Sequence, residues 1–180
     1  PSYLPSDVEL MLGRVDLANM PGNAAPGVFN NEVELLRNYL NKDHRWRHKL
    51  FTVPRRALMA DRFGDLNGEA RSATGYRNFE PMVGPGNTIL ANVSDAFLPT
   101  NCWISLLSSS SWLWTYACGG GQDTSMSAMG SHGEYFDAWS TDIVAQDAKA
   151  VFFMLEGSWM GNWDHTDNFM RAALATPSMG

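Results

Sequence analysis

The sequence is poor in charge of either sign, since only 18% of its 180 residues are charged, against about 25% in an average soluble protein. Hydrophobic residues make up 44% and aromatic residues 12%, which excludes a disordered chain, because disorder needs many charges and few aromatics. Lysine and arginine number 13 against 19 acidic residues. This acidic balance argues against nucleic acid as a partner, because nucleic acid attracts a basic surface.

Long apolar runs are missing as well. The longest, residues 150–155, has the size of a strand and falls short of the ~20 residues that cross a membrane, so we expect no direct membrane insertion. The chain starts without an initiator methionine or a recognisable signal peptide, and we therefore expect a piece of a longer polypeptide. Its length suits a single domain over residues 1–180.

Cysteine is scarce, with Cys102 and Cys118 alone. Two cysteines predict either one disulfide in an oxidising compartment or two buried thiols. The count does not decide between these alternatives.

Short apolar segments alternate with helical patterns along the chain. Helices are expected at about residues 32–49, where Asn31 and Glu34 resemble a capping box, and at 167–175. Strands are expected at the short apolar segments 8–15, 57–60, 88–93, 111–118 and 150–155. Apolar strands alternating with helices or long connections predict an α/β fold with a mostly parallel sheet flanked by helices.

Candidate functional residues follow three of these expected strands. Ligands bind beyond the carboxyl ends of parallel strands, because loops vary there while the sheet holds them in place. The three ends are Asp61, Cys118-Gly-Gly-Gly-Gln122 and Glu156-Gly-Ser-Trp-Met-Gly-Asn-Trp-Asp164. Glycine permits tight turns and close backbone approach at the last two.

Four segments together resemble the gingipain-like cysteine peptidase family. They are Leu12-Gly-Arg-Val-Asp16, Glu34-Leu-Leu-Arg-Asn-Tyr-Leu40, Tyr116-Ala-Cys-Gly-Gly120 and the stretch from Val151 to Asp164. The resemblance implies a caspase-like three-layer sandwich in a secreted or cell-surface bacterial protein. It also implies that the early part of the sheet lies upstream of Pro1, so that the domain is incomplete.

The catalytic dyad of that family has no counterpart here. The family uses a His-Gly pair at the end of one strand as general base and a cysteine at the end of the next as nucleophile. Its Tyr-x-Gly-His-Gly pattern falls on residues 116–120, with Gly119 at the histidine position. Its Cys-x-x-Gly-x-aromatic pattern falls on residues 158–163, with Ser158 in place of cysteine. The resemblance therefore implies a module without peptidase activity.

An active hydrolase is the alternative. It would use Cys118 or Ser158 as nucleophile with a displaced base, either His132 or His165. A histidine in a loop is more often a solvated surface residue, so we expect no peptidase activity.

Aromatic and polar side chains gather in the turn after residues 150–155. Trp159, Asn162, Trp163 and Asp164 have the composition of a sugar-binding platform, in which an indole stacks on the sugar ring and polar groups hold its hydroxyls. Together with Asp61 they are the expected binding residues for a protein or glycan partner. Core packing is the alternative for the two tryptophans.

Two further tryptophans have a simpler interpretation. Trp112 and Trp114 lie two apart on an expected strand, so they should share one face and fill space between sheet and helices.

The segment Asp164-His-Thr-Asp167 offers oxygen and imidazole ligands of the kind that divalent ions take. Calcium bound by Asp164, His165 and Asp167 is therefore one expectation, with no other cofactor. The favoured alternative is that Asp164 or Thr166 caps the following helix.

The sequence thus predicts a non-catalytic module, extracellular or at the cell surface, with a structural or binding role. Its partner would be a protein, a glycan or the rest of the parent polypeptide. A structural subunit of an extracellular assembly, forming oligomers through apolar surface, is the further alternative.

Overall fold

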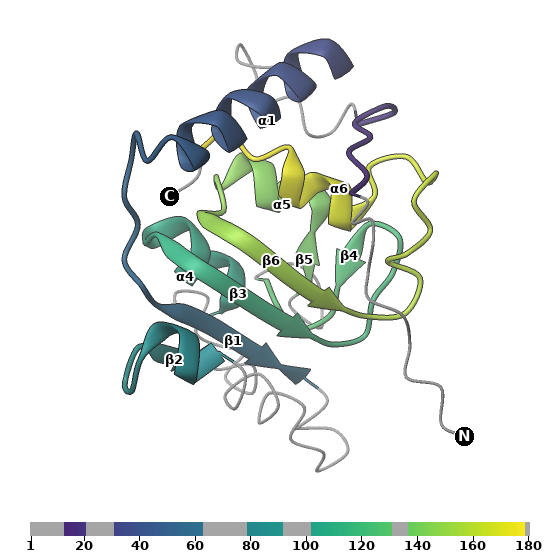
Figure 1. The fold of residues 1–180 in the computed structure, drawn as a ribbon. Coiled ribbons are helices and arrows are strands. Elements are labelled where there is room, and N and C mark those ends of the chain that lie inside the picture. Colours follow the sequence, from purple (N-terminus) through teal and green to yellow (C-terminus); the bar gives the residue numbers. More distant parts are fainter. Residues whose placement is uncertain (1–12, 21–30, 63–78, 92–101, 131–136, 179–180) are drawn as a thin grey trace, which may run out of the picture.

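The computed structural model describes residues 13–20, 31–62, 79–91, 102–130 and 137–178. Its main element is a four-stranded sheet with the strand order β2-β1-β3-β6, in which every pair is parallel. The strands are β1 (Ala57–Asp61), β2 (Thr88–Leu90), β3 (Trp112–Cys118) and β6 (Ala150–Glu156). Figure 1 shows this sheet with its helices, and the predicted α/β class with a parallel sheet is confirmed.

Residues 79–83 are helical, and four helices with both ends in the described part of the chain also accompany the sheet. They are α1 (Glu32–Arg47), α4 (Trp103–Ser109), α5 (Ser140–Ala145) and α6 (Phe169–Leu174). A small antiparallel pair, β4 (Ser125–Met126) and β5 (Ala138–Trp139), completes the elements. The helix α1 begins as predicted, because the Asn31 side chain accepts a hydrogen bond from the backbone N–H of Glu34 at 3.1 Å.

Two predicted elements need correction. The helix α6 is shorter than the expected 167–175, and its N-cap is neither Asp164 nor Thr166. Asn168 caps it instead, because its Oδ1 accepts a hydrogen bond from Arg171 N at 3.1 Å. Residues 13–15 have no strand structure, and the rest of the strand expected at 8–15 lies outside the described residues.

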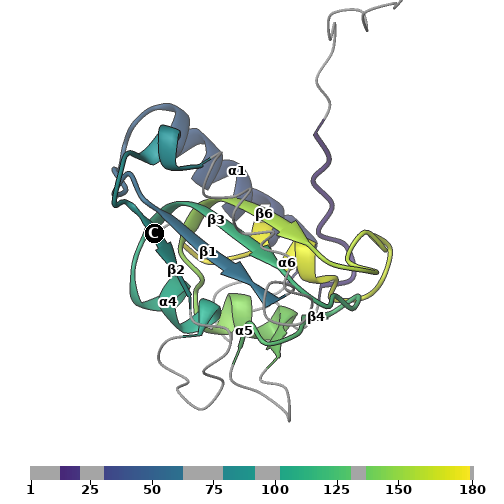
Figure 2. The ribbon, with the colours of Figure 1, turned by 90° about the horizontal axis from the view of Figure 1, so that it is seen from below.

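The sheet buries side chains on both faces. One face packs into the main core with Trp103 of α4, Ile143 of α5 and Phe169 of α6. The other face carries a smaller cluster that includes Met59, Tyr116 and Phe79. Figure 2 shows α4 and α5 together on one side of the sheet and α1 toward the other.

Trp112 and Trp114 do not share a face, contrary to the expectation. Trp112 is buried in the main core, whereas Trp114 packs with the smaller cluster and stacks on Phe152 with ring centroids 4.7 Å apart. The N–H groups of Leu113 and Trp114 both donate to the carbonyl of Arg56, at 3.0 and 3.3 Å. Two residues thus oppose one, and this interrupts the alternation of side chains.

The strand β6 forms one edge of the sheet and β2 the other. The helix α1 lies beside β6 (Figure 1), and its Trp46 ring meets Phe152 edge-on with centroids 5.8 Å apart. None of the helices described here is long and apolar enough to cross a membrane.

Candidate functional site

The carboxyl ends of three neighbouring strands meet at one edge of the sheet. Asp61 pairs in register with Cys118, and Cys118 pairs with Glu156. Three predicted strand ends therefore lie side by side. The strand β1 has β2 on one side and β3 on the other, so the order of the strands reverses here. Ligands of open parallel sheets bind at such a reversal.

The two positions to which the resemblance would assign a catalytic dyad follow neighbouring strands. The strands β3 and β6 are paired, and the N–H of Gly119 donates to the carbonyl of Glu156 at 3.1 Å. Ser158 follows Glu156 by two residues in the next turn. Gly119 and Ser158 thus follow two paired strands, and they provide neither an imidazole nor a thiol.

Cys118 is a fully buried thiol on β3. Burial raises its pKa to about 11, and the carboxylates of Glu156 and Asp61 act in the same direction. Burial likewise raises the pKa of Tyr116, whose hydroxyl donates to Glu156 Oε2 at 3.1 Å. The thiolate is the nucleophilic form of cysteine, so Cys118 is a poor nucleophile at neutral pH.

The His165 ring is hydrogen-bonded to neither of the two candidate nucleophiles. Its Nε2 lies 3.9 Å from Asp123 Oδ2, and its Nδ1 lies 2.8 Å from the Thr166 carbonyl oxygen. Within the described residues, no histidine ring forms a hydrogen bond or ion pair with Cys118 or Ser158. His132 lies outside the described residues.

Both cysteines are buried, and neither forms a disulfide. Cys102 precedes α4, and its Sγ lies 3.1 Å from the hydroxyl oxygen of Ser105. Of the two alternatives that the cysteine count left open, the structure contains the pair of thiols.

The two tryptophans of the turn after β6 differ in their exposure to solvent. Trp159 is 69% exposed and has a φ of 62°, which is rare for a bulky side chain and marks a position held by its surroundings. Asn162 in the same turn donates to Asp123 Oδ1 at 2.9 Å. Trp163 is half-buried, and its Nε1 is buried without a hydrogen-bond partner. Only Trp159 offers the open ring that stacking on a ligand requires.

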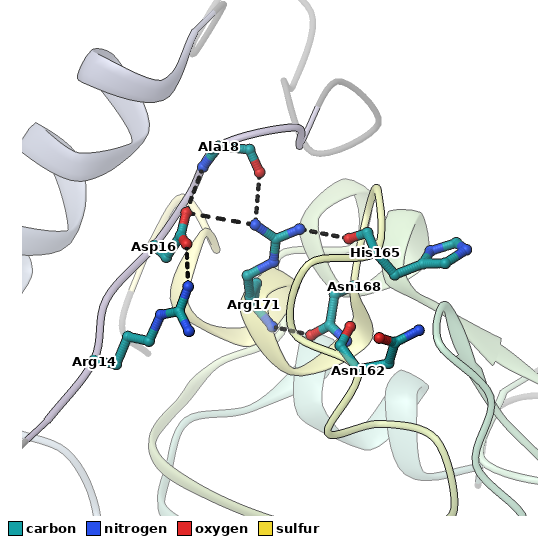
Figure 3. A network of polar contacts seen from close by, with 7 residues as sticks. All are labelled: Arg14, Asp16, Ala18, Asn162, His165, Asn168 and Arg171. Carbon is teal, nitrogen blue, oxygen red and sulfur yellow. Dashed lines mark hydrogen bonds and ion pairs between the residues drawn. The ribbon is translucent and has the colours of Figure 1, made fainter.

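A buried arginine holds this turn in place (Figure 3). The Arg171 side chain is 2% exposed and donates to the carbonyls of Ala18, at 2.7 Å, and of His165. Asp16 Oδ1 lies 3.6 Å from Arg171 Nη1. The Asn168 amide adds a hydrogen bond to the Met160 carbonyl at 2.9 Å. Residues 14–18, the turn and α6 are therefore joined.

The expected calcium ligands are not assembled. Across the described ranges, no group of three or more histidine, cysteine, aspartate or glutamate residues could hold a metal ion. Asp164, His165 and Asp167 follow one another in the turn, but the His165 ring faces Asp123. Calcium binding stays a prediction that these contacts do not support.

Two residues of this region were missed in the sequence analysis. Asp123 follows the glycines after β3 and contacts both Asn162 and His165. Arg171 lies inside a helix and was not considered. The only local signal for Asp123 was its place just past a strand end, and Arg171 gave none.

Comparison of the chain with family models, with curated proteins and with solved structures finds no match. The class of this protein therefore rests on its fold and its site alone. The chain is an α/β protein with a four-stranded, all-parallel sheet and helices.

Proposed function

We propose that the chain is a gingipain-like domain with a caspase-like fold, without a catalytic dyad, that serves as a structural or binding module of a secreted or cell-surface bacterial protein. The observation that carries the proposal is the pairing of β3 with β6, which brings Gly119 and the turn with Ser158 together. These are the positions to which the resemblance assigns the dyad. A parallel sheet with packed side chains on both faces supports the caspase-like fold.

The binding role belongs to the turn after β6. Trp159 supplies an exposed ring, and the N–H of Asn162 donates to its carbonyl. Asn162 and His165 of the same turn both face Asp123, so that polar groups accompany the ring. The network around Arg171 fixes the turn, so little conformational entropy is lost when a partner binds. A glycan fits this combination of ring and hydrogen-bonding groups best.

Retention on immobilised glycans tests the binding role. The wild-type chain should be retarded, and Trp159→Ala should abolish the retardation while its circular dichroism is unchanged. Trp139→Ala is the matched control, because Trp139 is also exposed, at 44%, but lies on β5. Equal retention of the wild type and Trp159→Ala would show that the turn is not the binding site.

Peptide hydrolysis tests the absence of catalysis. The purified chain should release no fluorophore from a mixed peptide library, because Cys118 is protonated and buried and no histidine ring of the described residues forms a hydrogen bond with Ser158. Release that disappears in Ser158→Ala or Cys118→Ala would establish the hydrolase instead.

A structural subunit is the second candidate, and exposed apolar side chains favour it. Val33, Leu36 and Leu40 are 62%, 37% and 55% exposed on α1, and their spacing places them along one side of the helix. Phe152 and Met154 of β6 are also exposed. If this role holds, size-exclusion chromatography should give an oligomer that Leu40→Glu dissociates. A monomer at high concentration would exclude it.

A further inference from the structure

A cavity of about 400 Å³ lies between α1, β6 and α6. Its wall is largely apolar and contains six aromatic side chains: Tyr39, Trp46, Trp114, Phe152, Phe153 and Trp163. Small-molecule sites have volumes of about 300–1,000 Å³, with mostly apolar and aromatic walls and a few polar groups. The cavity therefore has the size and the lining of a small-molecule site. It does not include Trp159.

One polar group of the wall lacks a partner. The Nε1 of Trp163 is buried and makes no hydrogen bond. A buried N–H group without an acceptor is costly and uncommon in proteins. Because this N–H has almost no accessible surface, the indole must turn slightly toward the cavity before a bound molecule can supply the missing acceptor.

A cation lies beside this donor. The Arg14 guanidinium carbon is 5.8 Å from the centroid of the Trp163 ring, and Arg14 also lines the cavity. Its Nη2 donates to Asp16 at 2.8 Å. The remaining N–H groups of Arg14 meet no acceptor among the described residues. A positive charge and an unused N–H donor therefore occur at the same part of the wall.

The other charged residues of the wall are already engaged. Lys42 donates to the carbonyls of Leu174 and Thr176 and to the Thr176 hydroxyl, which uses its three protons. Asp43 accepts from Arg47 Nε at 2.8 and 2.9 Å. Among the charged residues of this wall, Arg14 is thus the one with N–H groups left for a ligand.

We propose that this cavity binds a small aromatic carboxylic acid. The ring of the acid packs among the aromatic side chains that Trp46 and Phe152 bring together, and the carboxylate accepts hydrogen bonds from Trp163 Nε1 and Arg14. An anion suits this place because the nearest available groups are a cation and an N–H donor. The inference does not rest on the proposed function, since Trp159 and the dyad positions take no part in it.

Isothermal titration calorimetry tests the proposal with three acids as probes: 2-naphthylacetate, 3-phenylpropionate and indole-3-propionate. At least one should bind to the wild-type chain, and its uncharged amide should bind about tenfold more weakly, as expected when a charge-assisted hydrogen bond is lost. Trp163→Phe keeps the ring and removes the donor, and Arg14→Gln removes the charge. Each should weaken the acid about tenfold.

Two matched variants control for general effects of substitution. Trp159→Phe changes a tryptophan four positions away that does not line the cavity, and Arg55→Gln changes an exposed arginine that donates to Met82. Both should bind the acid as the wild type does. Ala173→Phe, which places a ring in the cavity, should abolish binding.

Thermal unfolding shows that each variant is folded before it is titrated. Trp163→Phe should keep or raise the Tm, since it removes an unpaired buried donor. Three results would overturn the proposal: no heat with any of the three acids at millimolar concentration, equal affinity for acid and amide, or equal loss in Trp159→Phe and Trp163→Phe. Glycan retention that depends on Trp159 is a separate readout, so the two proposals can fail independently.

Discussion

Gly121 packs directly against Ser158, because a Cβ atom on Gly121 would come 2.5 Å from the Ser158 carbonyl oxygen. The turns after β3 and β6 thus touch through their backbones, and only glycine leaves enough room. Gly121→Ala must displace the turn that carries Trp159. We expect a loss of about 1–3 kcal/mol in the free energy of unfolding, measured by urea denaturation.

Gly161→Ala is the control for this substitution. A Cβ atom on Gly161, in the same turn, meets no other atom within 4 Å. Its free energy of unfolding should stay within about 0.5 kcal/mol of the wild type. Equal losses in the two variants would mean that the turns do not touch as described.

Lys42 should make stability rise with pH. Burial lowers its pKa to about 8 from the ordinary 10.5, although the Asp147 carboxylate acts in the opposite direction. Between about pH 8 and 10.5 the unfolded chain therefore holds a proton at Lys42 that the folded chain has lost. The free energy of unfolding should increase over this window, by about 3 kcal/mol at most.

The variant Lys42→Met isolates this contribution. Denaturation at several values of pH should give a difference between wild type and variant that grows in favour of the wild type as the pH rises from 8 to 10.5. A difference that is constant across this range would contradict the lowered pKa of Lys42.

Arg171 should be the most sensitive polar residue of the turn. Arg171→Met leaves the partly buried carbonyls of Ala18 and His165 without their donors, and we expect a loss of about 2–4 kcal/mol. Arg171→Lys should recover only part of this stability. The lysine ammonium can donate to one of the carbonyls, but it cannot reproduce the forked donors of a guanidinium. Arg55→Met, at an exposed arginine, should cost less than about 1 kcal/mol. Similar losses at both sites would refute a special role of Arg171.

Cys118 should resist alkylation in the folded chain. It is fully buried, and burial raises its pKa to about 11. At neutral pH the reagent therefore cannot reach the sulfur, and almost no reactive thiolate is present. A Cys102→Ala variant isolates its signal. Mass spectrometry should find no iodoacetamide adduct at pH 7.5 in buffer and a complete adduct in urea. Rapid labelling of the folded chain would instead indicate an activated nucleophile.

The longer elements could be predicted from the sequence because their signals are local. The cap at Asn31 fixes the start of α1, and unbroken apolar runs mark β1, β3 and β6. The short elements have no such signal. The helix α4 has seven residues and no side-chain cap, and β4 and β5 have two residues each, too few for a hydrophobic period to appear.

Only the part of the site that the sheet positions could be predicted from the sequence. Parallel strands bring their carboxyl ends together, so Asp61, Cys118 and Glu156 could be expected at one edge. The contrast between Trp159 and Trp163 could not, since it depends on the packing of residues 14–18 and α6 around the turn. Contacts between segments so far apart in sequence leave no trace in local composition.

Every strand pairing in the main sheet joins distant parts of the chain. Ala57 pairs with Thr88 and with Trp114, and Trp112 pairs with Ala150. Such pairings lose chain entropy before they gain contacts, and this slows folding. During synthesis, β1 gains its first partner when β2 has left the ribosome and its second only after β3, and β3 must wait for β6. The nascent chain therefore carries unpaired, aggregation-prone strands for most of its production, and its yield should depend on chaperones.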